Sequence, residues 1–186
     1  MRWPTPSTGP ATCSGYRRLG NDMAGLEDLY REIIIDHYKN PRNKGELPTP
    51  PAHRTEGMNP SCGDEISVYL VVDGTGPDAI VTDVKIGGQG CSISQASASM
   101  MSAAAKGKPV HEARRLIAAF KSMMGIDSPG AAGVADEPGE PVADLTDVKL
   151  GDLAALRGVV KFPVRIKCAV LAWNTMAQGL DETAGA

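Results

Sequence analysis

The chain has 186 residues and a formal net charge of −3, and 42% of its residues are hydrophobic but only 4% aromatic. This length favours one domain whose core is built mainly from aliphatic side chains. The slightly acidic charge argues against nucleic acid as a partner, and no apolar run approaches the ~20 residues that a membrane span needs. The four cysteines are widely spaced in a chain without a clear secretion signal, which favours reduced thiols in the cytoplasm over a disulfide framework.

Residues 1–22 are rich in proline, glycine, serine and threonine and show no apolar period. We expect them to form a disordered N-terminal extension. Met23 is a candidate for the biological start of the protein. Cys13 lies in this extension and is therefore left out of the expected chemistry.

A first helix is predicted from about Leu26 to Lys39, where Asn40 and Pro41 end it. Its apolar residues recur at steps of three and four, so they share one face that should pack on the core. The residues of that face are Leu26, Leu29, Tyr30, Ile33, Ile34 and His37. His37 is therefore interpreted as a packed core or boundary residue.

Two antiparallel strands are predicted over about 66–72 and 80–86, joined by a hairpin connection at 73–77. β-Branched residues recur at period two in both segments, which is typical of half-buried strands. One set of alternating residues comprises Ile66, Val68, Leu70 and Val72 in the first strand and Ile80, Thr82, Val84 and Ile86 in the second. A weaker signal at 53–57 indicates a third strand.

Helices are predicted over about 92–106 and 110–124, with a short helical piece at 150–156 and a last helix that begins near Pro163. Residues 125–148 are acidic and rich in glycine, proline and alanine, so we expect a surface insert there. The whole layout predicts an α+β fold in which about three antiparallel strands pack against about five helices.

Cys62 and Asp64 stand just before a predicted strand, in the segment Asn59-Pro60-Ser61-Cys62-Gly63-Asp64. Glycine permits a tight turn, and residues two apart in an extended chain point to one side, so the sulfur and the carboxylate can converge on one ion. From this pair alone, a turn or strand-start role for Asp64 stays the stronger interpretation.

Cys91 follows Gly87, Gly88 and Gly90, which are expected to break the second strand immediately before it. Unpaired backbone N–H groups at a helix start favour a thiolate, which would make Cys91 reactive. A helix-capping role or a small buried side chain is the alternative. The glycine spacing matches no phosphate-binding loop.

Cys168 lies in the first turns of the last predicted helix, after Arg165 and Lys167. These two cations would favour a thiolate, yet taken alone Cys168 is better interpreted as a buried helix residue. The three histidines are scattered and none adjoins a cysteine, so a cysteine hydrolase with a Cys–His pair has no support in the sequence.

Four segments in chain order resemble the SufU/IscU family, also described as NifU N-terminal-like, over about residues 23–180. Residues 30–43 (YREIIIDHYKNPRN) resemble its opening helix, and residues 59–64 (NPSCGD) resemble its first ligand loop. Residues 87–101 (GGQGCSISQASASMM) and 162–169 (FPVRIKCA) resemble the second and third. The resemblance implies a SufE/NifU (IscU-like) fold over residues 23–181, including the insert.

The resemblance also implies one tetrahedral Zn²⁺ site with three sulfurs and one oxygen, and Zn–S distances near ~2.3 Å. The implied ligands are Cys62, Asp64, Cys91 and Cys168. Their negative charge exceeds that of the ion, so Arg165 and Lys167 are candidates for the cations beside the site. In the IscU branch a histidine precedes the third cysteine, whereas here that position is Lys167; this difference and the insert resemble the SufU branch.

The function implied by the resemblance is that of a sulfurtransferase in iron–sulfur cluster assembly. It would take sulfur from a SufS-type cysteine desulfurase and pass it to a SufBCD-type scaffold. A histidine of the desulfurase would displace Cys62 from zinc, and the freed Cys62 thiolate, the catalytic group, would accept the persulfide sulfur. The alternatives are an IscU-type scaffold that holds a transient [2Fe–2S] cluster on the same residues, and a structural zinc protein without a transfer role.

Overall fold

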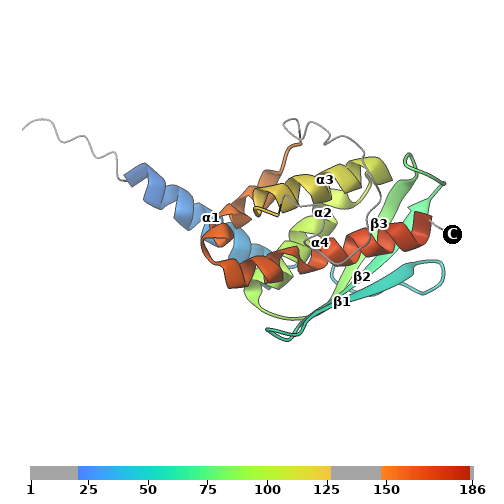
Figure 1. Ribbon diagram of the computed structural model, residues 1–186, viewed down its shortest axis with the longest axis horizontal. Helices are drawn as coiled ribbons and strands as arrows, with labels where there is room; N and C mark the ends of the chain where they lie inside the picture. Colours follow the sequence, from blue (N-terminus) through green and yellow to red (C-terminus); the bar gives the residue numbers. More distant parts are fainter. Residues whose placement is uncertain (1–20, 127–147, 185–186) are drawn as a thin grey trace, which may run out of the picture.

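A computed structural model describes residues 21–126 and 148–184 (Figure 1). Its elements are α1 (Asn21–Lys39), β1 (His53–Asn59), β2 (Asp64–Asp73), β3 (Ile80–Gln89), α2 (Ser92–Ala105), α3 (Val110–Met123), the 3₁₀ helix η1 (Gly151–Lys161) and α4 (Pro163–Ala184). In this described part, three antiparallel strands and five helices confirm the predicted α+β class. Residues 1–20 of the predicted tail (1–22) and residues 127–147 of the predicted insert (125–148) lie outside the described residues.

The sheet has the order β1-β2-β3, and α4 packs along β1 and β2 while α2 packs on β3 and α4 (Figure 1). The contact between α4 and β1 is close because both elements carry a glycine there. A Cβ atom at Gly57 on β1 would lie 2.0 Å from Oγ1 of Thr175, and one at Gly179 on α4 would lie 2.8 Å from Oγ1 of Thr55. These glycines therefore let α4 approach the sheet directly.

Helix α2 lies at the centre of the molecule and is buried on nearly all sides. Its many alanines and serines allow other helices to approach closely, and α1 and α4 both pack on it. The largest buried side chains near it include Trp173 and Phe120, whose rings are stacked with centroids 4.3 Å apart. The core thus joins α2, α3 and α4 on one face of the sheet.

Helix α1 begins at Asn21, five residues before the predicted start, so the last two residues of the predicted tail are helical. Its N-terminal half projects from the body of the molecule (Figure 1). Leu29 is accordingly 49% exposed, although it belongs to the predicted apolar face. Ile33 and Ile34 pack against the core and His37 is buried, so the second half of that face is covered.

Strand β3 shows a register shift opposite Val71 and Val72, which makes Thr82 the extra residue of a β-bulge. The bulge changes the phase of the alternation. Ile80 and Thr82 are therefore exposed, although they were predicted to alternate in phase with the inward residues further along the strand. The buried residues of β3 are Val81, Val84 and Ile86.

Strand β3 also continues through Gly87 and Gly88 to Gln89, so the predicted break at these glycines is wrong. Gly88 has a φ of +102°, and a Cβ atom there would lie 2.1 Å from the carbonyl oxygen of Glu65. The absence of a side chain at Gly88 therefore lets β3 stay paired with β2 up to the Cys91 segment.

The remaining helices lie close to their predicted positions. Helices α2 and α3 each end one residue earlier than predicted, and α4 begins at Pro163 as predicted. The 3₁₀ helix η1 is longer than the predicted piece at 150–156. Among the helices that the structure describes, none is both long and apolar enough to cross a bilayer.

Candidate metal centre

Cys62 lies in a tight turn between β1 and β2. The backbone N–H groups of Cys62 and Gly63 both donate to the carbonyl oxygen of Asn59, at 3.3 and 2.8 Å. The Asn59 side chain accepts the N–H of Ser61 at 3.1 Å, and Gly63 has a left-handed φ of +71°. This turn, rather than the predicted extended alternation, carries the exposed Cys62 toward Asp64.

Asp64 is the first residue of β2 and is only 2% exposed. Its Oδ1 accepts the backbone N–H of Cys91 at 2.9 Å, and its Oδ2 lies 3.5 Å from the Cys91 sulfur. A Cβ atom at Gly90 would lie 2.8 Å from Oδ1, so glycine at this position makes room for the carboxylate. Gly90 therefore lets the Asp64 carboxylate lie close to the backbone that leads to Cys91.

Cys91 caps the N-terminus of α2. Its backbone is extended, and its sulfur accepts the N–H of Ser94 at 3.5 Å. The capping role that was the alternative prediction for Cys91 is therefore confirmed, and the same sulfur also contacts Asp64.

Cys168 lies in the second turn of α4, is 2% exposed, and has its sulfur 3.6 Å from that of Cys62. The ligand atoms of Cys62, Asp64 and Cys168 all lie within 4.8 Å of one another. Two sulfurs bound to one tetrahedral zinc ion are about 3.8 Å apart, given Zn–S bonds of about 2.3 Å. The spacing and the donor types of these three residues therefore fit zinc. The sulfur of Cys91, the fourth predicted ligand, is not part of this group of three, and it contacts the group through Asp64.

The electrostatics of the site depend on a buried carboxylate surrounded by thiols. Burial alone would raise the pKa of Asp64, but the N–H of Cys91 and the thiols of Cys168, Cys62 and Cys91 hold this pKa below its ordinary value. The pKa of the Cys168 thiol is raised, first by burial and then by Asp64 and Cys62. The preferred interpretation of Cys168 as a buried helix residue is confirmed. A bound divalent cation would have to displace the proton of its thiol.

The four residues border a cavity of about 470 Å³. Its lining consists of Cys62, Gly63, Asp64, Gln89, Gly90, Cys91, Val164, Arg165 and Cys168. Of the two predicted cations, Arg165 lines the cavity, whereas Lys167 is exposed on α4 outside this lining. Three apolar side chains close in sequence to Cys62 or Cys168 are exposed. They are Met58, Phe162 and Val164, and Val164 is 77% exposed.

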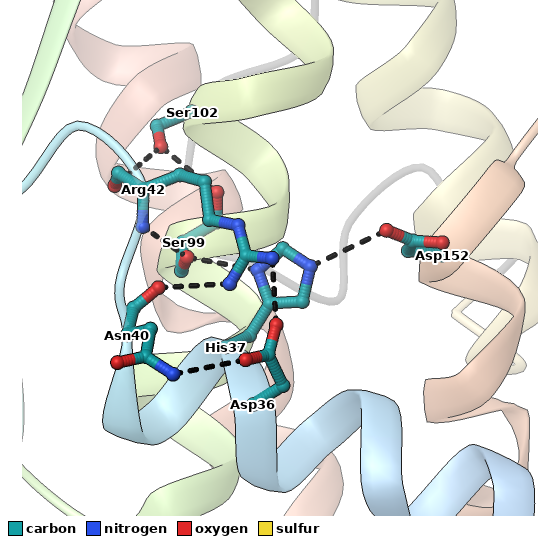
Figure 2. Close-up of polar contacts among 7 residues, drawn as sticks. All are labelled: Asp36, His37, Asn40, Arg42, Ser99, Ser102 and Asp152. Atoms are coloured by element: carbon teal, nitrogen blue, oxygen red, sulfur yellow. Dashed lines mark hydrogen bonds and ion pairs between the residues drawn. The ribbon is translucent and has the colours of Figure 1, made fainter.

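The histidines contact other groups. His37 is bonded to Ser99 and Asp152 (Figure 2), while His53 contacts Glu182 and His111 contacts the carbonyl oxygen of Pro77. Within the described ranges no histidine is in contact with a cysteine. A Cys–His nucleophile pair therefore has no support in the structure either.

Sequence reasoning missed two residues that shape the site. Asn59 holds the Cys62 turn, and Gly90 gives space to Asp64. Asparagine commonly bonds to the backbone two residues on, so Asn59 followed by Pro60 was a usable turn signal. The role of Gly90 depends on a contact with a distant strand, for which the local sequence carries no signal.

Comparisons with known proteins agree on one family. The family model described as the NifU-like N-terminal domain matches residues 29–169. The zinc-dependent sulfurtransferase SufU of Bacillus subtilis is 44% identical, over 87% of this chain and 96% of that protein. The iron–sulfur cluster assembly scaffold protein IscU of Streptococcus pyogenes is 34% identical, over 88% of this chain and 90% of that protein.

The solved structures include a putative iron–sulfur cluster assembly scaffold protein for the SUF system from Fervidobacterium islandicum. It is 33% identical and superposes with a TM-score of 0.56, covering 80% of this chain and 94% of that one. The likeness therefore extends over the fold as well as the sequence.

Proposed function

The chain belongs to the family of NifU-like N-terminal domains, and from this premise we propose that it is a zinc-dependent sulfur acceptor in iron–sulfur cluster assembly. The observation that carries the proposal is the approach of Cys62, Asp64 and Cys168 to within 4.8 Å of one another. Cys91 adds a third sulfur through its contact with Asp64. The similarity to a relative named as a zinc-dependent sulfurtransferase supports both the metal and the transfer role.

The proposed ligands are Cys62, Asp64, Cys91 and Cys168. When bound, zinc would supply a closed tetrahedral site that keeps the Cys62 thiolate from reacting indiscriminately. Arg165 lines the same cavity and is the cation best placed to offset the excess negative charge of these ligands. Lys167 would contribute from the surface of α4.

Cys62 is the proposed acceptor because it is exposed at a turn, whereas Cys168 is buried and Cys91 is half-buried. Its thiolate attacks the terminal sulfur of a persulfide held by the donor enzyme. The electron pair of Cys62 forms the new S–S bond, the S–S bond of the donor breaks, and the donor cysteine leaves as a thiolate. One sulfur atom moves and no external oxidant or reductant is needed.

The proposed donor is a SufS-type cysteine desulfurase, and the proposed recipient is a SufBCD-type scaffold. The exposed apolar side chains of Val164 and Phe162 stand on the segment that leads to Cys168, where a docked donor would bury them. We assign the transfer to the cytoplasm, where free thiols such as those described here persist.

Desulfurase turnover with and without this protein tests the proposal. Wild-type protein should stimulate turnover and gain the mass of one sulfur atom on Cys62. Cys62→Ala should abolish the stimulation, while the matched variant Cys13→Ala should keep it. Full stimulation by Cys62→Ala would exclude the proposed role of this thiol.

A scaffold role is the second candidate, because the similar protein from Streptococcus pyogenes is named as an IscU scaffold. It predicts stoichiometric iron and sulfide, with visible absorption, in protein purified without oxygen. Colourless protein that contains zinc would favour the sulfur acceptor. A purely structural zinc site would leave desulfurase turnover unchanged.

A further inference from the structure

Ser97 connects helices α2 and α4 through a hydroxyl that both donates and accepts a hydrogen bond. Its Oγ donates to the carbonyl oxygen of Ala169 at 2.6 Å and accepts the indole N–H of Trp173 at 3.0 Å. All three residues are fully buried. The hydroxyl therefore makes a directed contact between two helices in the interior.

The interface around Ser97 has the composition to pack without a hydroxyl. Its neighbours on α2, Ala96 and Ala98, are buried alanines, and so is Ala172 on α4. A buried hydroxyl costs free energy unless it is bonded, whereas apolar contacts carry little direction. What Ser97 adds is therefore a fixed position and rotation of α4 relative to α2.

On each of the two helices that Ser97 connects, a proposed zinc ligand lies near this contact. Ala169 is covalently next to Cys168, and Cys91 caps the helix that carries Ser97. Ser97 follows Cys91 by six positions, about 9 Å along a helix axis. One hydrogen bond thus joins the helix that Cys91 caps to the carbonyl group of the residue that follows Cys168.

We infer that Ser97 is a positioning residue of the metal centre, which sets the spacing between Cys91 and Cys168 without touching the ion. This inference rests on the proposed zinc site. Removing the hydroxyl leaves the Ala169 carbonyl and the Trp173 indole N–H without this partner. Helix α4 then loses its directed contact with α2, and Cys168 is no longer held in the ligand geometry.

The test compares Ser97→Ala with Ser102→Ala in the full chain. Ser102 is an equally buried serine further along α2, and its hydroxyl donates to the carbonyl oxygens of Arg42 and Ser99, at 3.2 and 2.9 Å. Zinc affinity is measured by competition with a chromophoric chelator, and stability by urea unfolding. Ser97→Ala should lower zinc affinity about tenfold or more, and Ser102→Ala less than about twofold, at comparable losses of stability.

Cobalt(II) in place of zinc supplies a readout that stability alone does not change. The absorption bands of tetrahedral, thiolate-bound cobalt should shift in Ser97→Ala and stay unchanged in Ser102→Ala. Equal zinc affinities in the two variants, or an unchanged cobalt spectrum in Ser97→Ala, would overturn the inference.

Two further outcomes are decisive. If Ser97→Ala does not fold, Ser97→Thr, which keeps the hydroxyl, is measured instead. A zinc affinity of Ser97→Thr within about threefold of wild type supports the inference, and a tenfold loss overturns it. Wild-type protein that binds no zinc contradicts both this inference and the proposed function. Wild-type protein that binds zinc, with Ser97→Ala unaffected, contradicts the inference alone.

Discussion

The candidate metal centre and the polar cluster around His37 both adjoin helix α2 and both border a cavity. Only the His37 cluster is closed, in the sense that its charged side chains pair with one another. The metal centre is open, because no side-chain cation is bonded to Asp64 in the part of the chain that the structure describes. The His37 cluster consists of Asp36, His37, Asn40, Arg42, Ser99, Ser102 and Asp152 (Figure 2). In this cluster Arg42 pairs with Asp36 at 2.6 Å, and His37 contacts both Ser99 and Asp152. At the metal centre, the contacts of the buried Asp64 are thiols and one backbone N–H, beside a cavity.

These two regions show that the residue types in a cluster do not decide its function. Ser99, His37 and Asp152 are the residue types of a hydrolase triad, yet Ser99 is fully buried and its hydroxyl already accepts the N–H of Arg42 at 2.7 Å. The metal centre instead gathers one carboxylate and three thiols, with no side-chain cation bonded to Asp64 among the described residues. Metal-donor groups without a paired cation indicate a ligand, and charged groups that pair with one another indicate a structural role.

The largest expected effect comes from removing a thiol of the open set. Cys168→Ser should lower zinc affinity by at least about 100-fold, because losing a ligand costs more than losing an outer hydrogen-bond partner. Zinc content after dialysis and chelator competition would measure it. Ser99→Ala, in the closed cluster, is the control and should keep its zinc. Stoichiometric, tight zinc in Cys168→Ser would remove this residue from the site.

The closed cluster should respond in stability alone. Ser99→Ala leaves Nδ1 of His37 and the N–H of Arg42 without their partner, which should lower the free energy of unfolding by about 1–3 kcal/mol. Urea unfolding would measure the loss. Ser122→Ala, an exposed serine on α3, should stay within about 0.5 kcal/mol of wild type. A loss of zinc affinity as large as that of Cys168→Ser would show that the two regions are not independent.

An intermediate effect is expected at the mouth of the open site. Val164→Asn makes an exposed apolar side chain polar, so about tenfold more protein should be needed for half-maximal stimulation of a desulfurase, at unchanged zinc content. Ile80→Asn is the matched control, because Ile80 is exposed at the start of β3, about 30 Å along the strand from Gln89. Equal effects of both variants would argue against docking at this mouth.

The smallest expected effect concerns pH and the edge of the closed cluster. Hydrogen bonds from Asn40 and then Arg42 hold the pKa of Asp36 below its ordinary value. A lowered pKa in the folded state stabilises the fold above the unfolded value of about 3.9, and this stabilisation is lost as the pH falls through the folded value. Wild type should therefore be slightly more stable than Asp36→Asn near about pH 6, as measured by urea unfolding. If wild type stays more stable than Asp36→Asn at pH values well below the lowered pKa, ionisation of Asp36 is not the cause of the stability difference.

The sequence predicted most elements because their periodicity is local. The apolar steps in α1, the alternation in β2 and the proline that starts α4 each depend on a few neighbouring residues. The bulge at Thr82 and the exposure of Leu29 were missed, because both depend on what packs against the element.

In the candidate site, too, some features have a local sequence signal and others depend on contacts between distant segments. Asp64 and Cys168, considered singly, favoured structural interpretations, and only the resemblance to a family assembled the four ligands. The roles of Gly90 and Ser97 escaped prediction because each arises from a contact between segments far apart in the chain. The raised pKa of Cys168 likewise depends on its burial beside Asp64 and not on the cations next to it in sequence.

X-ray absorption at the zinc K edge of zinc-loaded, full-length protein tests the central claim most directly. Convergence of Cys62, Cys91, Cys168 and Asp64 on one ion predicts three sulfur neighbours near about 2.3 Å and one oxygen near about 2.0 Å. A coordination sphere made of oxygen and nitrogen alone, or one that keeps three sulfurs after Cys168→Ser, would contradict it.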